Sequence, residues 1–193
     1  PIPTMPNSSS WHLANKYYWN KLIPSLLKKL KKGDVVFIMN AIGDENLNND
    51  IYLNLLDEGL KEFSKTLSER SIKLLFLNAI PFDFKDKNNN SCSVVNASIH
   101  WFNTSNRCIP VYQTKNIFLK EREKLTNVLK DLEQKKLLTS VDLIDIFCPS
   151  ELCTFWDKNG IPLYRDRFHP SVFGARESSA LIKKGLDKMN EKN

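Results

Sequence analysis

Three apolar-rich runs along the chain each follow a longer stretch of helical periodicity. The runs cover residues 34–39, 72–77 and 141–147. In the first, Val35-Val36-Phe37-Ile38-Met39 follows Asp34 with no alternation of polar and apolar positions. A continuous apolar run of this length indicates a strand that is buried on both faces of a parallel sheet. We therefore predict three strands.

Four other stretches have the spacing of apolar positions that indicates amphipathic helices. These helices are predicted over about 15–32, 51–69, 116–136 and 171–189. In the first, Pro24 should perturb the helix or mark its true start, and Gly33 should end it. In the last, the positions predicted to face inward are Ala175, Ile182, Leu186 and Met189.

Helices and strands therefore alternate, which predicts an α/β fold: a three-layer α/β/α sandwich around a parallel sheet. Residues 1–14 are predicted to form an irregular lead-in, and residues 15–193 one domain. Residues 81–113 have no clean period, as in functional or elaborated loops. In such folds, ligand sites form beyond the carboxyl ends of the strands. We therefore expect the site in the loops that follow the first and third strands.

The formal net charge is +6, and the densest basic cluster consists of Lys28, Lys29, Lys31 and Lys32. This cluster lies at the end of the first predicted helix, where cations complement the helix dipole. No nucleic-acid-binding motif accompanies it, so we interpret it as a solvated helix end. The sequence has no run of 18 or more apolar residues of the kind that spans a membrane.

The four cysteines fall into two local groups, Cys92 with Cys108 and Cys148 with Cys153. Their spacing does not choose among the three possible disulfide connectivities, and it matches no standard zinc-ligand pattern. Sequons for N-glycosylation begin at Asn7, Asn89, Asn96 and Asn103. Paired cysteines and clustered sequons together favour an oxidising compartment, either extracellular or on the lumenal side of the secretory pathway.

The clearest catalytic pattern is Asp166-Arg167-Phe168-His169. An Asp three residues before a His, across a tight turn, can hold one ring nitrogen so that the other acts as a general base. The alternative is an exposed pair near a helix start, where Asp is favoured in any case. Ser171 is the better candidate for the helix cap. His12 and His100 have no carboxylate at a useful spacing, and we interpret them as surface or packing residues.

The C-terminal third of the chain resembles a known family. Its motifs are Val141–Cys148, Cys153, Asn159-Gly160, Tyr164, Asp166-x-x-His169-Pro-Ser171 and Gly174-Ala175. Their order is similar to the closing segment of SGNH (GDSL-like) hydrolases, most of all the SGNH domains fused behind membrane acyltransferase-3 domains. The resemblance covers about Tyr18 to Lys184. It implies a three-layer fold, O-acyl ester chemistry on a carbohydrate-like or other hydroxylated substrate, and a Ser–His–Asp triad that contains Asp166 and His169.

The nucleophile and the oxyanion donor of such a site are harder to place. The family's nucleophile lies in a Gly-Asp-Ser block after the first strand, and this sequence contains no Gly-Asp-Ser. The serines at 8–10 lack the glycine context of a nucleophile elbow. For the oxyanion, we prefer Asn40, directly after the first predicted strand, to Asn46. The chain begins with Pro1 rather than Met, and we expect the family's first strand and nucleophile upstream of Pro1.

The sequence thus predicts an SGNH-type esterase or O-acyltransferase domain, incomplete at its N-terminus and with little activity alone. Its expected partners are an acyl ester or carbohydrate-like substrate and a membrane acyltransferase domain in the same parent chain. No cofactor, metal or nucleic acid is expected. Two alternatives stay open: a non-catalytic binding module on a degenerate SGNH fold, and a metal-binding domain that uses the four cysteines.

Overall fold

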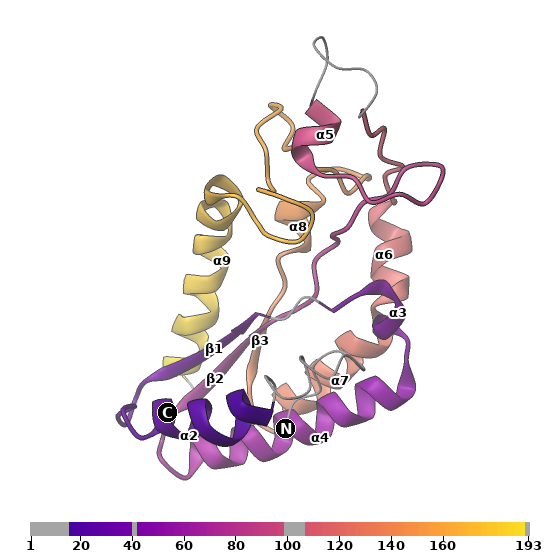
Figure 1. Ribbon diagram of the computed structural model, residues 1–193. Coiled ribbons are helices and arrows are strands. Elements are labelled where there is room, and N and C mark those ends of the chain that lie inside the picture. The colour runs from indigo at the N-terminus through magenta and orange to yellow at the C-terminus, as the bar shows by residue number, and fades with distance from the viewer. Residues whose placement is uncertain (1–15, 40–41, 99–106, 192–193) are drawn as a thin grey trace.

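The computed structural model describes residues 16–39, 42–98 and 107–191, and three parallel strands form its central sheet (Figure 1). The strands are Val35–Met39 (β1), Lys73–Leu77 (β2) and Thr139–Val141 (β3), in the order β1-β2-β3. Helices α4 (Asp50–Ser68) and α7 (Glu123–Gln134) pack on one side of the sheet, and α9 (Val172–Glu191) packs on the other. The chain therefore has the predicted three-layer α/β/α architecture.

The remaining helices are short. They are η1 (Tyr18–Leu22, a π-helical turn), α2 (Ile23–Leu27), α3 (Asp44–Leu47), α5 (Val94–Ser98), α6 (Lys115–Glu121) and α8 (Ile144–Phe147). The predicted helix over 15–32 is thus a π-helical turn followed by a short α-helix. Pro24 lies in the first turn of that α-helix, where its missing N–H costs nothing, so this proline marks the start as predicted.

The third strand is shorter than predicted and ends at Val141 instead of Phe147. The carboxylate of Asp142 explains the difference, because its Oδ1 accepts a hydrogen bond from the backbone N–H of Ile144 at 3.0 Å. This bond turns the chain out of the sheet and into α8. The prediction of a strand over 141–147 was wrong for 142–147.

The prediction that the first strand is buried on both faces was also wrong. The side chains of Phe37 and Met39 are 44% and 48% exposed. Their in-register neighbours on β2, Leu75 and Leu77, are 0% and 3% exposed. β1 is an edge strand of the described sheet, and α9 packs chiefly on β3 and also on β2.

Small residues of α9 face the sheet and the loop before the helix. Its buried positions are Gly174, Ser178, Gly185 and Met189, whereas Ala175 is exposed and Ile182 and Leu186 are half-buried. A Cβ atom on Gly185 would lie 2.4 Å from Cγ2 of Val141, and one on Gly174 would lie 2.3 Å from the carbonyl oxygen of Leu163. The inward position predicted for Ala175 is therefore wrong, because close approach requires glycine at the preceding residue.

Two disulfides hold the loops beyond the strands, Cys92–Cys108 and Cys148–Cys153. All four cysteines are buried and none is free. The chain therefore does not use these cysteines as metal ligands. In the residues that the structure describes, no group of three or more His, Cys, Asp or Glu side chains is arranged to hold a metal ion.

Replacing Gly185 with Val should destabilise the fold, because the new side chain would push α9 away from Val141 and Leu75. Overpacking of this kind costs about 1–3 kcal/mol. Ser179→Val, at an exposed position of the same helix, is the matched control and should cost only about a few tenths of a kcal/mol. Urea unfolding measures both, and equal stabilities of the two variants would contradict the close packing of α9.

Candidate active site

Asp166 and His169 lie on a tight turn between the Cys148–Cys153 loop and α9. The carboxylate Oδ1 of Asp166 accepts hydrogen bonds from the backbone N–H groups of Phe168 and His169, both at 2.9 Å. Nδ1 of His169 lies 2.8 Å from Oδ1 and 2.9 Å from Oδ2 of the same carboxylate. The three-residue spacing therefore places the carboxylate on one ring nitrogen of the histidine, as the sequence predicts.

The local hydrogen bonds favour the ionised form of Asp166. The backbone N–H of Phe168, then the ring and backbone N–H of His169 and the side chain of Arg165, hold the pKa of this carboxyl well below its usual range. A carboxylate can only accept hydrogen bonds, so the geometry assigns the proton to Nδ1 of His169. The lone pair of Nε2 is then free to act as a base. The His169 side chain is 63% exposed, so this nitrogen is open to a substrate.

The turn docks on the segment that follows β2. The hydroxyl of Tyr164 donates to the carbonyl oxygen of Pro81, and the backbone N–H of Asp83 donates to the carbonyl oxygen of Arg167 at 2.9 Å. Phe168 packs edge-on against Phe82, with 5.7 Å between ring centroids. These contacts place the Asp–His pair beyond the carboxyl ends of the strands, where sites form in folds of this class.

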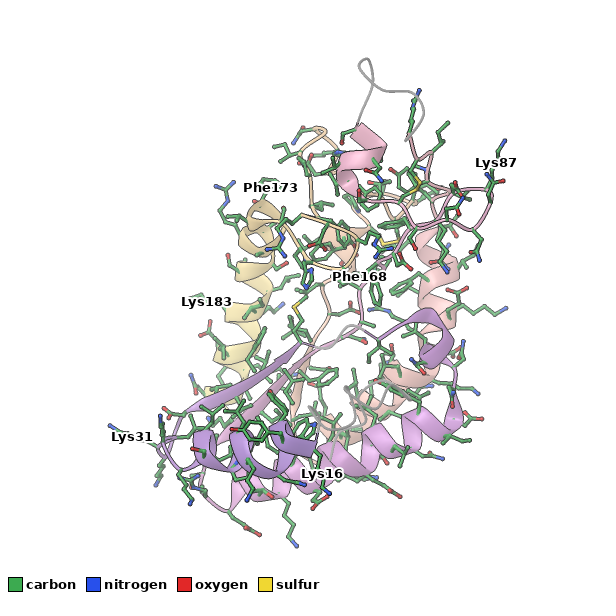
Figure 2. The ribbon with its side chains drawn as sticks, in the orientation of Figure 1. Lys16, Lys31, Lys87, Phe168, Phe173 and Lys183 are labelled. Carbon is green, nitrogen blue, oxygen red and sulfur yellow. A yellow bond between two sulfur atoms is a disulfide. The ribbon has the colours of Figure 1, made fainter. Side chains whose placement is uncertain are left out.

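Ser171 begins the helix that follows the turn. Its Oγ accepts a hydrogen bond from the backbone N–H of Gly174 at 2.9 Å and donates to the carbonyl oxygen of Pro162 at 2.6 Å. Ser171 is therefore the cap of α9, as predicted, and Asp166 does not serve that purpose. Figure 2 shows the neighbouring Phe168 above the carboxyl ends of the strands, with Lys31 beyond their opposite ends.

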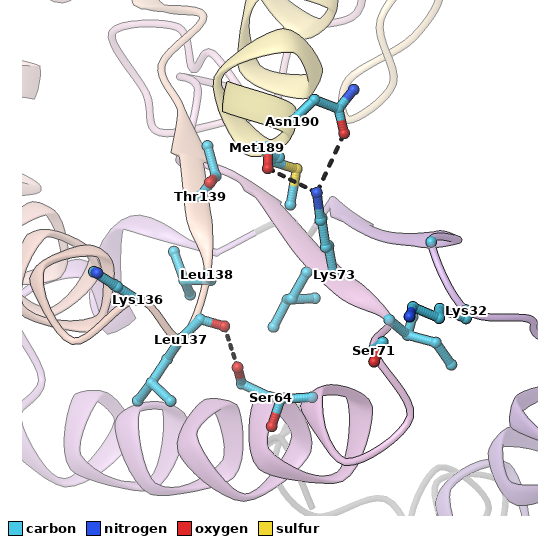
Figure 3. Close-up of a pocket in the computed structure, with 14 residues that line it drawn as sticks. Lys32, Ser64, Ser71, Lys73, Lys136, Leu137, Leu138, Thr139, Met189 and Asn190 are labelled. Carbon is cyan, nitrogen blue, oxygen red and sulfur yellow. Dashed lines mark hydrogen bonds between the residues drawn. The ribbon is translucent and has the colours of Figure 1, made fainter. Parts of the chain in front are cut away.

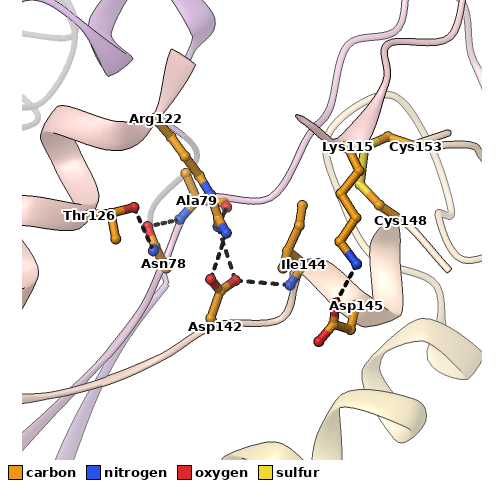
Figure 4. Close-up of polar contacts among 10 residues, drawn as sticks. All are labelled: Asn78, Ala79, Lys115, Arg122, Thr126, Asp142, Ile144, Asp145, Cys148 and Cys153. Atoms are coloured by element: carbon orange, nitrogen blue, oxygen red, sulfur yellow. Dashed lines mark hydrogen bonds and ion pairs between the residues drawn. A yellow bond between two sulfur atoms is a disulfide. The ribbon is translucent and has the colours of Figure 1, made fainter. Parts of the chain in front are cut away.

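A buried arginine close to this edge was not predicted from the sequence. Arg122, only 1% exposed, donates from Nη1 and Nη2 to the two oxygens of Asp142 at 3.0 and 2.6 Å (Figure 4). Nη1 also donates to the carbonyl oxygen of Ala79 at 2.7 Å. The ion pair thus ties the end of β2 to the end of β3. One feature of the sequence could have revealed Arg122: it is a charged residue four positions after Phe118, on the apolar face of a predicted helix.

The predicted oxyanion donor Asn40 and the glycosylation candidates Asn7 and Asn103 lie outside the described residues. So do the serines at 8–10, and the histidines 12 and 100 that we interpret as surface or packing residues. Asn46, the less favoured oxyanion candidate, lies in α3. Among the residues that the structure describes, no serine hydroxyl forms a hydrogen bond with the ring of His169. The structure thus brings Asp166 and His169 together and leaves the nucleophile and the oxyanion donor as predictions.

A cavity of about 730 Å³ lies at the opposite end of the sheet (Figure 3). Its lining includes Lys32, Lys73 and Lys136, and Nζ of Lys73 donates to the carbonyl oxygen of Met189 at 2.7 Å. The C-terminal ends of α4, α7 and α9 lie around it. Because helix C-termini carry partial negative charge, these lysines compensate the helix dipoles. The cavity is therefore not the site of the Asp–His chemistry.

The fold and the Asp–His turn at its carboxyl edge define an α/β domain of the hydrolase type. A family model described as "SGNH domain (fused to AT3 domains)" matches residues 6–184. The match covers most of the chain, which therefore belongs to the SGNH domain family. Membership supports a hydrolase- or esterase-like domain.

One solved structure similar to the chain is that of a "putative acylhydrolase" from Bacteroides fragilis NCTC 9343. It shares 14% sequence identity with the chain and has a TM-score of 0.47, and the alignment covers 94% of this chain and 71% of that one. No curated protein is found to match the chain. Within the described residues, no helix is long and apolar enough to cross a membrane.

Asp166 should make the stability of the turn dependent on pH. Its pKa is lower in the folded protein than in the unfolded chain, so its contribution to stability is present above the unfolded value of about 3.9 and is lost as the pH falls. The carboxylate is 39% exposed, which limits this contribution to about 1 kcal/mol. Asp166→Asn should therefore be less stable than the original chain at pH 7, and the gap should close toward pH 2. Urea unfolding at several pH values measures the gap, and a gap independent of pH would contradict this assignment.

Proposed function

We propose that this domain carries the His–Asp half of an SGNH-type ester hydrolase or O-acyltransferase site. The observation that carries the proposal is the Asp166 carboxylate on Nδ1 of His169 at 2.8 Å, at the carboxyl edge of the sheet, with Nε2 open. Family membership adds the expectation of acyl ester chemistry. The substrate class that we propose is an O-acyl ester of a carbohydrate-like or other hydroxylated compound. Phe168, 39% exposed beside His169, offers an apolar ring against which a sugar can stack.

In the proposed mechanism, Nε2 of His169 takes the proton of a serine hydroxyl as the serine oxygen attacks the acyl carbon. Asp166 holds the Nδ1–H tautomer and stabilises the imidazolium. The ester C–O bond then breaks, and the imidazolium returns the proton to the leaving alkoxide. Water or an acceptor hydroxyl attacks the acyl-serine in the same way. We propose that the serine lies upstream of Pro1 and that Asn40 donates to the oxyanion.

A second candidate function is a binding module without catalysis. It is favoured by the absence, in the described residues, of a serine hydrogen-bonded to His169, and by the exposure of the pair, since the His169 side chain is 63% exposed. An Asp–His pair can persist in such a module because the carboxylate also closes the turn through the N–H groups of Phe168 and His169.

The proposal is tested by ester turnover with p-nitrophenyl acetate and an O-acetylated sugar. The 193-residue chain should show negligible turnover, whereas a polypeptide extended upstream of Pro1 should hydrolyse both esters. In the extended protein, Asp166→Asn should lower kcat by about 10²–10⁴-fold because the tautomer is no longer fixed, and His169→Ala should lower it at least as far.

Asp157→Asn is the matched control for these variants. The carboxylate of Asp157 also closes a turn, accepting from the N–H groups of Asn159 and Ile161 at 2.9 and 2.7 Å, but the structure records no histidine contact to it. Its loss should leave turnover unchanged. Strong turnover by the 193-residue chain that is lost in His169→Ala would place the nucleophile within the chain. No turnover and no labelling by a fluorophosphonate in the extended protein would favour the binding module.

The disulfides fit a secreted or lumenal domain, and we propose that the protein is glycosylated there. Asn89 is exposed at the tip of the turn closed by Asp86, whereas Asn96 is half-buried in α5. When the chain is secreted from eukaryotic cells, Asn89→Gln should therefore remove one glycan mass and Asn96→Gln should remove none. Mass spectrometry before and after glycosidase treatment measures this, and an unglycosylated Asn89 would contradict it.

A further inference from the structure

The positive charge of the chain is concentrated in residues 16–32, the segment that contains η1 and α2. This segment has no Asp or Glu and six lysines, which are Lys16, Lys21, Lys28, Lys29, Lys31 and Lys32. In the rest of the chain, 22 basic side chains balance 22 acidic ones, so this segment accounts for the whole net charge of +6. All six lysines are exposed, and none forms an ion pair with a described carboxylate.

The end of α2 does not use these lysines as hydrogen-bond donors. A helix C-terminus leaves carbonyl groups unpaired, and cations often bind them. Here the guanidinium of Arg70 donates to the carbonyl oxygens of Leu27 and Leu30, the second at 3.0 Å. No Nζ atom of the six lysines bonds to a described residue. Within the described part of the chain, their charges are therefore available to an external partner.

One face of η1 and α2 is held against the domain. Trp19 packs edge-on against Phe63 of α4, with 5.8 Å between ring centroids. Ile23 and Leu27 line a groove of about 280 Å³ between α2 and α4. This inner face fixes the orientation of the segment, so its opposite face points away from α4.

The opposite face carries apolar side chains among the lysines. Tyr18, Leu22 and Leu26 recur at intervals of four residues and are 42%, 39% and 45% exposed. The neighbouring Tyr17 is 64% exposed. The segment therefore presents tyrosine rings and leucine side chains to solvent together with a surplus of positive charge.

An anionic lipid bilayer matches all three kinds of side chain. Lysine amines are attracted to its headgroup phosphates, tyrosine rings favour the interface, and leucine side chains enter the acyl boundary. A polyanion such as a nucleic acid would use the lysines but would gain nothing from the leucines. A second copy of the chain would bring six further lysines against these six, and like charges repel.

We propose that residues 16–32 form a docking surface for an anionic lipid bilayer. The segment lies on the bilayer and does not cross it, and Tyr18, Leu22 and Leu26 insert between the headgroups. Figure 2 shows Lys16 and Lys31 at the end of the molecule away from Phe168. Docking therefore leaves the turn next to Phe168 facing the aqueous side. The docking surface does not depend on the proposed function.

Co-sedimentation of the 193-residue chain with vesicles tests the proposal. The chain should bind vesicles of phosphatidylglycerol mixed with phosphatidylcholine, and should stay in solution with phosphatidylcholine alone. Binding should fall by about tenfold or more as salt rises from about 0.1 M to about 1 M, because salt screens the lysines. Binding that is independent of lipid charge or of salt would overturn the proposal, as would no binding to the anionic vesicles.

A pair of lysine variants tests where the charge acts. Lys28→Gln combined with Lys29→Gln should weaken binding by about 25-fold, because each lysine near an anionic surface contributes about fivefold. Lys183→Gln combined with Lys184→Gln, at exposed positions of α9, removes the same net charge and is the matched control. It should change binding by about twofold at most. Equal losses in the two pairs would overturn a surface localised to residues 16–32.

A pair of leucine variants separates a bilayer from other anions. Leu22→Ser combined with Leu26→Ser should weaken vesicle binding by about tenfold or more, because less apolar surface leaves water. The matched control is Ile117→Ser combined with Val172→Ser, which are 50% and 90% exposed on other helices and should leave binding unchanged. Thermal melting followed by circular dichroism verifies that each variant is folded. Unchanged binding of the leucine pair would overturn the proposal in favour of a polyanion site.

The docked face is identified by magnetic resonance with nitroxide-labelled lipid in the anionic vesicles. Amide signals of Tyr18, Leu22 and Leu26 should broaden, and those of Phe168 and His169 should not. The reverse pattern would overturn the proposal. A doubled mass in solution that is lost with the leucine pair would also overturn it, because the face would then bind a second copy. Ester turnover is measured separately, so its failure contradicts the proposed function alone.

Discussion

The loops at the carboxyl edge depend on one ion pair, between the buried Arg122 and Asp142, whose side chain is 44% exposed. Arg122 is fully buried, and its two-point contact with Asp142 joins the exits of β3 and, through the carbonyl oxygen of Ala79, of β2. Removing the Asp142 carboxylate would leave the charge of Arg122 buried without its partner, a change that typically costs about 3–5 kcal/mol. The segment after Ala79, residues 81–83, contacts the turn that contains Asp166 and His169. The position of the Asp–His pair therefore depends on the charged side chain of Arg122, although Arg122 lies outside the turn.

The hydrogen bonds of the Asp–His pair form within one turn, whereas the residues around that turn come from distant parts of the sequence. Four residues of one turn are enough to place a carboxylate on Nδ1 of His169 and to fix its tautomer. A nucleophile must come from another element, and among the described residues no serine is bonded to His169. Within the described residues, β1 pairs with β2 alone, and the side chain of Phe37 on β1 is 44% exposed.

The two ends of the sheet differ in their electrostatics. At the amino ends of the strands, the C-terminal ends of three helices surround a cavity whose lysines compensate partial negative charge, as Lys73 does at the carbonyl oxygen of Met189. At the carboxyl ends, disulfides and an aromatic cluster around Phe84 and Tyr164 hold the loops instead of regular structure. The cavity lies at the amino ends of the strands, whereas the hydrogen bonds between Asp166 and His169 lie at the other end.

Periodicity and local spacing determined much of this protein from the sequence alone. Alternating helices and apolar runs predicted the parallel sheet and its layers, and the three-residue spacing predicted the contact between Asp166 and His169, because both depend on neighbours along the chain. The pairing of Arg122 with Asp142, the exposure of Phe37 and the need for glycine at 174 and 185 were decided by tertiary structure. Each depends on which distant segment lies opposite. A strand at an edge and a strand inside a sheet have the same apolar pattern, and only the packing of neighbouring elements distinguishes them.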